Sequence, residues 1–181
     1  MRAAIAGFSS NYFYKGLLQT AAHLTNTGLH IFFIDTAGSG FNEMQGSDGM
    51  SLQNEGELQI ALKLVETESL NRLTTAFISP YAGQVAAAKE ILPKEMRIST
   101  IDSFQGQEKE TIILSLVRSN EEGDIGFLKD YRRMNVAITR AQEQLFVIGD
   151  SATIGSDNFY NSFLTYMETD GTYRTVWEFD L

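Results

Sequence analysis

Residues 101–117 read IDSFQGQEKETIILSLV, a polar turn that runs into an apolar stretch without alternation. Such a stretch is typical of a strand that is covered on both faces of a sheet. Runs of β-branched and aromatic residues lie at His30–Asp35, Thr74–Ser79, Thr111–Val117, Gln144–Ile148 and Thr172–Phe179. Segments with the 3.6-residue period of a helix separate them, so the sequence predicts an α/β domain with a mainly parallel sheet.

The segments between these strands carry the signals of helices and turns. We expect four helices, one beginning after Asn54 and three covering Ala82–Leu92, Asp130–Ala141 and Asp157–Met167. Asn54 followed by Glu57 has the spacing of a capping box. The glycine-rich segment Thr36–Gln53 is expected to be a connecting loop, and the last strand to form an edge of the sheet.

Length and composition fit one globular domain and exclude several classes of protein. The chain has 181 residues, of which 43% are hydrophobic and 20% charged, and it contains no cysteine. No stretch reaches the roughly 18 consecutive apolar residues of a membrane span, and the first residues are too short an apolar segment for a secretion signal. Without cysteine there is no disulfide, thiolate nucleophile or cysteine-ligated metal centre. We therefore expect a protein of the cytoplasm or nucleoid, with no membrane partner and no metal site of its own.

The formal net charge of −9 is unevenly distributed along the chain. Residues 89–140 hold nine basic and nine acidic side chains, whereas residues 141–181 hold one basic and seven acidic ones. Bulk electrostatic binding of a polyphosphate needs Lys and Arg to neutralise the phosphates. Any contact with nucleic acid must therefore be local or shared with another domain.

The glycine-rich segment lacks the residues of a phosphate-binding loop. Such a loop has the pattern Gly-x-x-x-x-Gly-Lys-[Ser/Thr], in which backbone amides and the lysine hold the phosphates. No lysine follows a glycine anywhere in this chain. The run Ile31–Asp35 resembles a strand ending in a magnesium-binding aspartate, but Thr36 stands where a catalytic glutamate is wanted. We interpret that run as a plain strand and turn, and predict that the chain alone does not hydrolyse ATP.

Two polar segments flank the apolar run of residues 111–117 and carry side chains suited to ligand chemistry. Gln105-Gly106 offers an amide and a flexible backbone position, expected at the carboxyl edge of the sheet; a tight turn is the alternative. Arg133 and Arg140 are seven residues apart, which places them on one helix face about 10 Å apart along its axis. We expect one of them to touch a ligand and the other to organise a carboxylate such as Glu108. The alternative is a solvated charged face.

Five segments, in order, resemble parts of the superfamily 1 helicases. Residues 101–110, IDSFQGQEKE, and 132–141, RRMNVAITRA, closely resemble motifs V and VI. Residues 78–84, ISPYAGQ, look like motif IV, and Asn54-x-x-Glu57 looks like the pair that precedes it. Residues 8–18, FSSNYFYKGLL, are similar to the segment that follows motif III. The best match is to the 5′-to-3′ translocating branch that includes the nonsense-mediated-decay helicase.

The resemblance implies a three-layer RecA-like domain of the P-loop NTPase type that spans residues 1–181 and forms part of a longer protein. Such helicases bind ATP and Mg²⁺ between two RecA-like domains, and the first of these carries the phosphate loop and an Asp-Glu pair. This chain looks like the second domain, which has neither. The implied partners are ATP and Mg²⁺, the N-terminal RecA-like domain of the same polypeptide, and single-stranded DNA or RNA.

The resemblance also implies roles for particular side chains. Arg140 would be the arginine finger that stabilises charge on the γ-phosphate, and Arg133 a second arginine of the nucleotide cleft. The residues implied to face the nucleotide are Gln105, Gly106, Glu108, Asn54 and Glu57. Those implied to contact the nucleic-acid backbone are Ser79, Pro80, Tyr81, Gln84, Ser99 and Thr100. Hydroxyls, amides and backbone N–H groups hold phosphates without adding charge, which is compatible with the net charge of −9.

One position departs from the family pattern. Some members place an arginine near Asn54 that contacts the γ-phosphate, whereas this chain has Gln53 and Glu55 there. Contact with the γ-phosphate would then be made by Arg133 or by the other domain.

The alternative function is a non-catalytic interaction or regulatory module that keeps the fold. The helicase function is favoured by four side chains that the fold alone does not require, namely Gln105, Glu108, Arg133 and Arg140. An unrelated doubly wound ligand-binding domain would need the motif order to be a coincidence. The choice between DNA and RNA stays open, because backbone contacts do not separate them.

Overall fold

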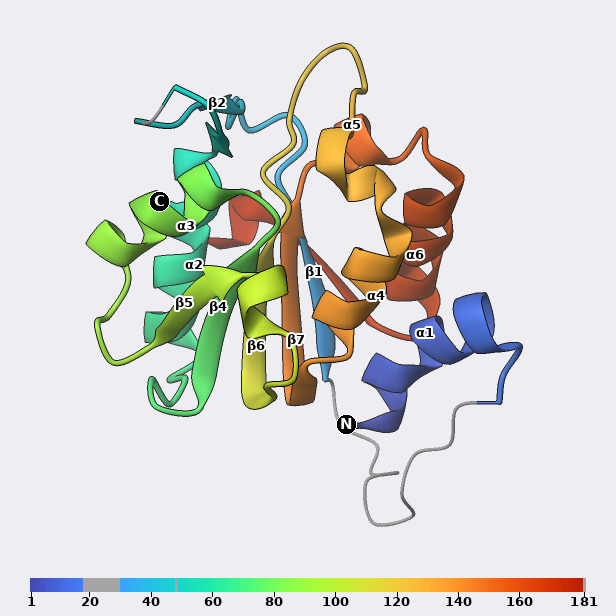
Figure 1. The fold of residues 1–181 in the computed structure, drawn as a ribbon. Coiled ribbons are helices and arrows are strands. Elements are labelled where there is room, and N and C mark those ends of the chain that lie inside the picture. Colours follow the sequence, from blue (N-terminus) through green and yellow to red (C-terminus); the bar gives the residue numbers. More distant parts are fainter. Residues whose placement is uncertain (18–29, 48, 181) are drawn as a thin grey trace.

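Six parallel strands form the centre of the protein. The computed structural model describes residues 1–17, 30–47 and 49–180. The strands of the sheet are β1 (Ile31–Asp35), β4 (Thr75–Ser79), β5 (Arg97–Thr100), β6 (Lys109–Ser115), β7 (Ala141–Gly149) and β8 (Thr172–Thr175). They lie in the order β5-β4-β6-β7-β1-β8, with every neighbouring pair parallel (Figure 1). The predicted parallel sheet is confirmed, and β8 is an edge strand as expected.

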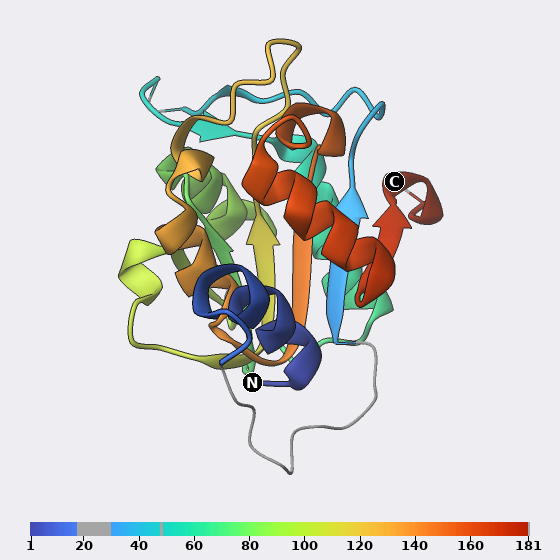
Figure 2. The same ribbon diagram turned by 90° about the vertical axis from the view of Figure 1, so that its right-hand side faces the viewer.

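Helices cover both faces of this sheet. The helices are α1 (Ala3–Tyr14), α2 (Glu55–Thr67), α3 (Ala82–Ile91), α4 (Tyr131–Ile138), α5 (Ser151–Ile154) and α6 (Asn158–Thr169). Figure 2 shows α1, α4 and α6 in front of the sheet, with α2 and α3 behind it. Helix–sheet–helix layering of this kind is the predicted three-layer RecA-like architecture.

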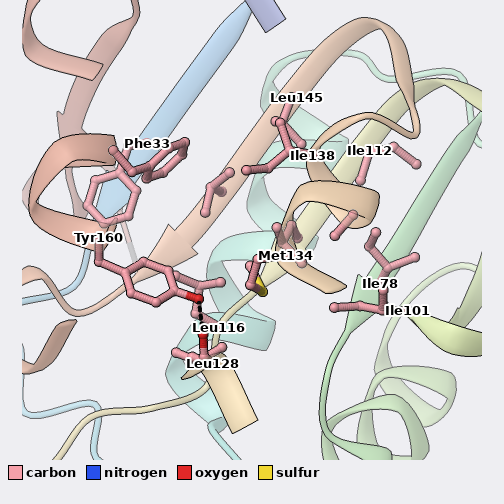
Figure 3. Close-up of a cluster of buried hydrophobic side chains, with 14 of the residues drawn as sticks. Phe33, Ile78, Ile101, Ile112, Leu116, Leu128, Met134, Ile138, Leu145 and Tyr160 are labelled. Carbon is pink, nitrogen blue, oxygen red and sulfur yellow. Dashed lines mark hydrogen bonds between the residues drawn. The ribbon is translucent and has the colours of Figure 1, made fainter. Parts of the chain in front are cut away.

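The two faces of the sheet bury separate hydrophobic clusters, because alternate residues of a strand point to opposite faces. In β6, Ile112 packs with the cluster under α1, α4 and α6, whereas its neighbour Ile113 packs with the cluster under α2 and α3. Figure 3 shows Met134 and Ile138 of α4 among sheet side chains that include Ile112. The apolar stripe of α4 therefore fixes motif VI against the sheet.

Several expected elements have different boundaries, and three of the differences change the kind of structure at that place. The predicted helix Asp130–Ala141 ends at Ile138, and the predicted strand Thr172–Phe179 ends at Thr175. A 3₁₀ turn, η4 (Val176–Glu178), follows that strand, and Glu178 Oε1 accepts a hydrogen bond from Thr175 N at 2.8 Å. The expected loop Thr36–Gln53 contains a two-stranded antiparallel hairpin of β2 (Met44–Gln45) and β3 (Leu52–Gln53).

Besides the hairpin, one strand and two α-helices were not anticipated from the sequence, namely β5, α1 and the four-residue α5. Strand β5 has four residues and begins with the exposed Arg97, so it lacks the apolar run of the other strands. Helix α1 carries apolar and aromatic residues on several sides, so no single stripe stands out.

We predict that Met134→Ala lowers the free energy of unfolding by about 2–5 kcal/mol, because removing a buried side chain leaves a cavity. Met134 is 2% exposed in the core. Arg132→Ala, an exposed position of the same helix, is the control and should change stability by no more than about 0.5 kcal/mol. Urea denaturation of both variants checks this. Equal effects would show that α4 is not anchored by its apolar face.

Candidate nucleotide and nucleic-acid interface

The motif V segment crosses from the carboxyl end of β5 to the amino end of β6. Ile101 N donates to Ser79 O at 3.2 Å, and Lys109 N donates to Arg140 O at 3.1 Å. Between them lie the turn η2 (Asp102–Phe104) and Gly106, whose φ is +79°. A Cβ at Gly106 would meet nothing within 4 Å, so the backbone conformation and not the space requires glycine there.

The side chains after Phe104 are open to solvent. Phe104 is fully buried and anchors the segment, whereas Gln105, Gly106 and Glu108 are exposed. The expectation that Gln105-Gly106 lies at the carboxyl edge is corrected, because the segment has already turned toward the start of β6. Its four exposed residues, 105–108, form the motif V turn.

Arg140 lies beside the motif V turn and holds its guanidinium against backbone carbonyls. Its Nε donates to Val136 O at 3.0 Å and its Nη1 to Gln107 O at 3.4 Å. Nη2 donates to Thr139 Oγ1 at 3.3 Å. A guanidinium has five N–H donors, so these contacts leave two for another acceptor.

Arg133 and Arg140 do not share a helix face, contrary to expectation. Helix α4 ends at Ile138 because Arg140 O is taken by the β6 ladder and β7 starts at the next residue. Arg133 Nη2 lies 3.0 Å from Asp102 Oδ2, and its Nε lies 3.8 Å from Asp130 Oδ2. The structure therefore pairs Arg133 with Asp102 across motifs V and VI.

Arg133 thus organises a carboxylate as expected, but that carboxylate belongs to Asp102 and not to Glu108. Glu108 Oε2 accepts a hydrogen bond from Gln142 Nε2 at 3.0 Å. Gln105, Arg132 and Arg133 line one hollow together with Ile101, Asp102, Asp130 and Val136. Motifs V and VI thus line this hollow together, and Arg140 contacts the motif V turn through Gln107 O.

Asn54, Glu57 and Gln84 are brought together, but inside the protein. All three are completely buried. Asn54 Nδ2 donates to Phe41 O at 2.8 Å and Val117 O at 3.2 Å, and its Oδ1 accepts from Glu57 N at 3.1 Å. Gln84 Oε1 accepts from Asn54 N at 2.8 Å. Asn54 caps α2 as expected, yet neither its amide nor that of Gln84 faces the open surface.

The Glu57 side chain completes this network instead of closing a capping box. Ser115 Oγ donates to Glu57 Oε2 at 2.5 Å, and Val117 N lies 3.0 Å from both carboxyl oxygens. Gln84 Nε2 donates to Ser115 Oγ at 2.8 Å. We call Asn54, Glu57, Gln84 and Ser115 the buried polar network; it joins α2 and α3 to the carboxyl end of β6.

Burial raises the pKa of the Glu57 carboxyl to about 8. The hydrogen bonds from Ser115 and Val117 act in the opposite direction, and the nearby charge of Asp150 adds to the rise. A carboxyl in this state is largely protonated at neutral pH, which reduces the cost of enclosing it.

The residues implied to contact nucleic acid lie at the carboxyl ends of β4 and β5, and most are enclosed. Ser79 and Thr100 are paired across the two strands. Ser79, Tyr81 and Ser99 are buried, whereas Pro80 and Thr100 are half-buried. Thr100 Oγ1 donates to Ser103 Oγ at 3.0 Å. Thr100 and Pro80, together with the exposed Ser103, are therefore the accessible part of this strand edge.

Comparison with known proteins gives one consistent family. A family model described as "AAA domain" matches residues 1–152. The DNA-binding protein SMUBP-2 of Rattus norvegicus is 34% identical over 99% of this chain, and the DNA polymerase alpha-associated DNA helicase A of Saccharomyces cerevisiae is 37% identical over 83%. The Regulator of nonsense transcripts 1 homolog of Arabidopsis thaliana is 33% identical over 92%.

The chain belongs to the AAA domain family, as a C-terminal domain of the superfamily 1 helicases. A solved structure, titled as the C-terminal domain of a possible DNA helicase from Lactobacillus plantarum WCFS1, supports the fold of this helicase domain. It superposes with a TM-score of 0.50 at 12% identity and covers 95% of this chain and 94% of that one. The helicase domain spans 20%, 26% and 15% of the three relatives' own lengths.

Sequence reasoning missed a second polar cluster of the helicase domain, at the carboxyl end of β6. Arg118 is 7% exposed; its Nε donates to Glu43 Oε2 and its Nη2 to Asp124 Oδ2, each at 2.9 Å. Glu43 Oε2 also accepts from Ser119 N at 2.8 Å. The available signal was the polar run of residues 118–120 directly after a buried strand, a place where α/β domains often bind ligands.

Asp35 is the last residue of β1 in the helicase domain, and its carboxylate accepts hydrogen bonds from other residues of the chain. Its carboxylate accepts from Ser151 N at 3.0 Å, Ser151 Oγ at 2.7 Å and Tyr173 Oη at 2.6 Å. This agrees with a plain strand and turn. Within residues 1–17, 30–47 and 49–180, no helix is long and apolar enough to cross a membrane.

We predict that Glu57 makes the free energy of unfolding fall as the pH rises from about 4.5 to about 8. The ordinary pKa is 4.5 and the folded value is about 8, so between them the unfolded chain has released a proton that the folded protein keeps. This contribution is complete below pH 4.5 and is lost above pH 8. Glu57→Gln should flatten the profile measured by urea denaturation at several pH values.

Glu55→Gln is the matched control, since Glu55 is exposed in the same first turn of α2. The control should keep the wild-type profile. A Glu57→Gln profile as steep as that of the wild type would contradict the raised pKa.

Proposed function

We propose that this chain is the second motor domain of an ATP-dependent DNA or RNA helicase, a part that spans residues 1–181 of a longer protein. The observation that carries the proposal is Arg140, which lies beside the exposed motif V turn with two N–H donors free of contacts to the described residues. The similarity to DNA helicases and to a regulator of nonsense transcripts supports this class of function.

Arg140 acts in this proposal as the arginine finger of a nucleotide site shared with the N-terminal RecA-like domain. Two of its three contacts are 3.3–3.4 Å long, so the guanidinium can leave them at low cost for a stronger anionic acceptor. The exposed Gln105, Gly106 and Glu108 would face the nucleotide from the same side. ATP with Mg²⁺ supplies the phosphoryl group that is cleaved, and the other domain supplies the phosphate loop.

Arg133 contributes to the same cleft as a positioning residue. Its ion pair with Asp102 joins motif VI to motif V at a distance of 3.0 Å. Asn54 and Glu57 act without reaching the surface, because their side chains form hydrogen bonds in the interior of the protein. Each would shape the nucleotide site through the strand ends it holds and not by direct contact.

The nucleic-acid strand would pass over the carboxyl ends of β4 and β5. Thr100 and Pro80 are the candidate residues that reach the surface there, with Ser103 beside them. Ser79, Tyr81, Gln84 and Ser99 are buried and would support this edge from below. Contacts of hydroxyls and backbone groups would be independent of base sequence. A 5′-to-3′ polarity and a location in the cytoplasm or nucleoid belong to the same proposal.

The direct test is Arg140→Ala in the longer protein that contains both RecA-like domains. We expect ATP turnover stimulated by single strands to fall about 10³- to 10⁵-fold, with nucleotide binding largely kept, because a finger acts on the transition state. Arg72→Ala, an exposed arginine outside the motif segments, should leave turnover near the wild-type value.

Unchanged turnover in Arg140→Ala would contradict the motor and favour a non-catalytic module. The 181-residue chain alone should show no ATPase activity, since its sequence has no phosphate loop. Stimulated hydrolysis by the pure chain, with its mass verified, would also overturn the proposal.

A further inference from the structure

Three basic side chains gather at the edge of the sheet formed by β5, and none of them belongs to a helicase motif segment. Lys89 lies in the last turn of α3, Lys94 in the connection that follows, and Arg97 at the start of β5. Together with Met96 and Ile98 they line a hollow of about 350 Å³, here called the basic hollow. Figure 1 shows β5 at the left-hand end of the sheet, with α3 beside it.

The cations of the basic hollow are not neutralised within the described part of the chain. Other basic residues, such as Arg2, Arg118, Arg133 and Arg174, lie within 4.0 Å of a carboxylate. Lys89, Lys94 and Arg97 form no such ion pair with the residues the structure describes. Glu90 and Glu95 are neighbours in sequence, but neither lines the hollow. In a chain of net charge −9, three uncompensated cations around one concavity are a local exception.

Of these three cations, Lys89 alone has a position in which its positive charge stabilises the fold. Lys89 lies at the C-terminal end of α3, where a positive charge offsets the partial negative charge of the helix terminus. Lys94 and Arg97 lie beyond α3, which ends at Ile91, and have no such role. Met96 is 5% exposed and forms an apolar floor under them.

Strand β5 links the hollow to the strand edge that carries Thr100. Ile98 in the hollow and Thr100 are alternate residues of β5 and so point to the same side of the sheet. From Arg97 to Thr100 the strand rises about 10 Å, so a few nucleotides can span both. An edge strand also leaves its outer backbone groups unpaired by a neighbouring strand.

We infer that the basic hollow binds the phosphodiester backbone of a single-stranded nucleic acid, as an additional contact that extends the strand path beyond Thr100. This inference rests on the proposed function for the kind of ligand, and on the hollow itself for the site. Lys and Arg around a shallow concavity recognise phosphate charge and not base sequence.

The test is a titration of the ¹⁵N-labelled 181-residue chain with a twelve-residue oligothymidylate, followed by NMR at several salt concentrations. We expect backbone amide shifts at residues 94–98 as well as at 99–103. Lys89→Gln/Lys94→Gln should abolish the shifts at 94–98. It should lower the slope of log K against log salt concentration by about 1.4, since each phosphate contact on a single strand contributes about 0.7.

Lys15→Gln/Lys63→Gln is the matched control. It removes two lysines that also form no ion pair with the described residues, one at the end of α1 and one on α2. The control should keep both the shifts and the salt slope. An equal loss in the control would assign the effect to net charge and overturn the site.

The remaining outcomes separate this inference from the proposed function. Shifts confined to residues 99–103 would overturn the basic hollow and leave the helicase strand path standing. Shifts confined to 94–98 would support the hollow and count against that path. No shift at either place would contradict both. Equal shifts with a twelve-residue polyglutamate would show a site for acidic peptides and overturn the assignment to nucleic acid.

Discussion

The carboxyl group of Glu57 holds the point at which the central strand β6 turns into the segment that leads to α4. Val117 follows β6 with a φ of +72°, a conformation that is costly for a β-branched residue. Glu57 accepts a hydrogen bond from the Val117 amide, and Asn54 donates one to the Val117 carbonyl. The backbone of Val117 is therefore held on both sides. The strained turn persists because the surrounding bonds over-determine it.

The buried polar network therefore serves the site without touching a ligand. Its members come from the start of α2, from α3 and from β6. Every side-chain amide hydrogen of Asn54 and Gln84 has an acceptor, and two of these acceptors are the carbonyls of Phe41 and Val117. A fully satisfied network of this kind specifies one arrangement of the elements it joins. The protonated state of Glu57 at neutral pH keeps an uncompensated charge out of the core.

The motif residues of this helicase domain consequently fall into two groups. One is enclosed and positions strand ends; it comprises Asn54, Glu57, Ser79, Tyr81, Gln84 and Ser99. The other reaches the surface; it comprises the exposed Gln105, Gly106 and Glu108 and the half-buried Arg133, Arg140, Pro80 and Thr100. Motif membership alone does not separate the groups, because an amide or hydroxyl can bond inward as well as to a phosphate.

The sequence predicted the parallel sheet because its strands are long apolar runs, and it predicted the start of α2 because Asn54 is a local cap. It failed where a distant partner decides the outcome. Helix α4 stops early because β6, some thirty residues away, takes the Arg140 carbonyl. The Glu57 side chain bonds to Ser115 and Val117 and not to the backbone at the start of α2. The local spacing of residues does not reveal these distant partners. Resemblance identified the motifs, whereas burial and bonding assigned their members to surface or interior.

The most direct measurement is a structure of the longer protein with ADP, a fluoride mimic of the transferred phosphoryl group, and a single-stranded oligonucleotide. The account predicts that Arg140 leaves Val136 O and Gln107 O and places a guanidinium nitrogen about 3 Å from the mimic. It also predicts that Asn54, Glu57 and Gln84 stay bonded to one another. Arg140 still bound to those carbonyls with the mimic in place, or Asn54 and Glu57 in contact with the nucleotide, would contradict it.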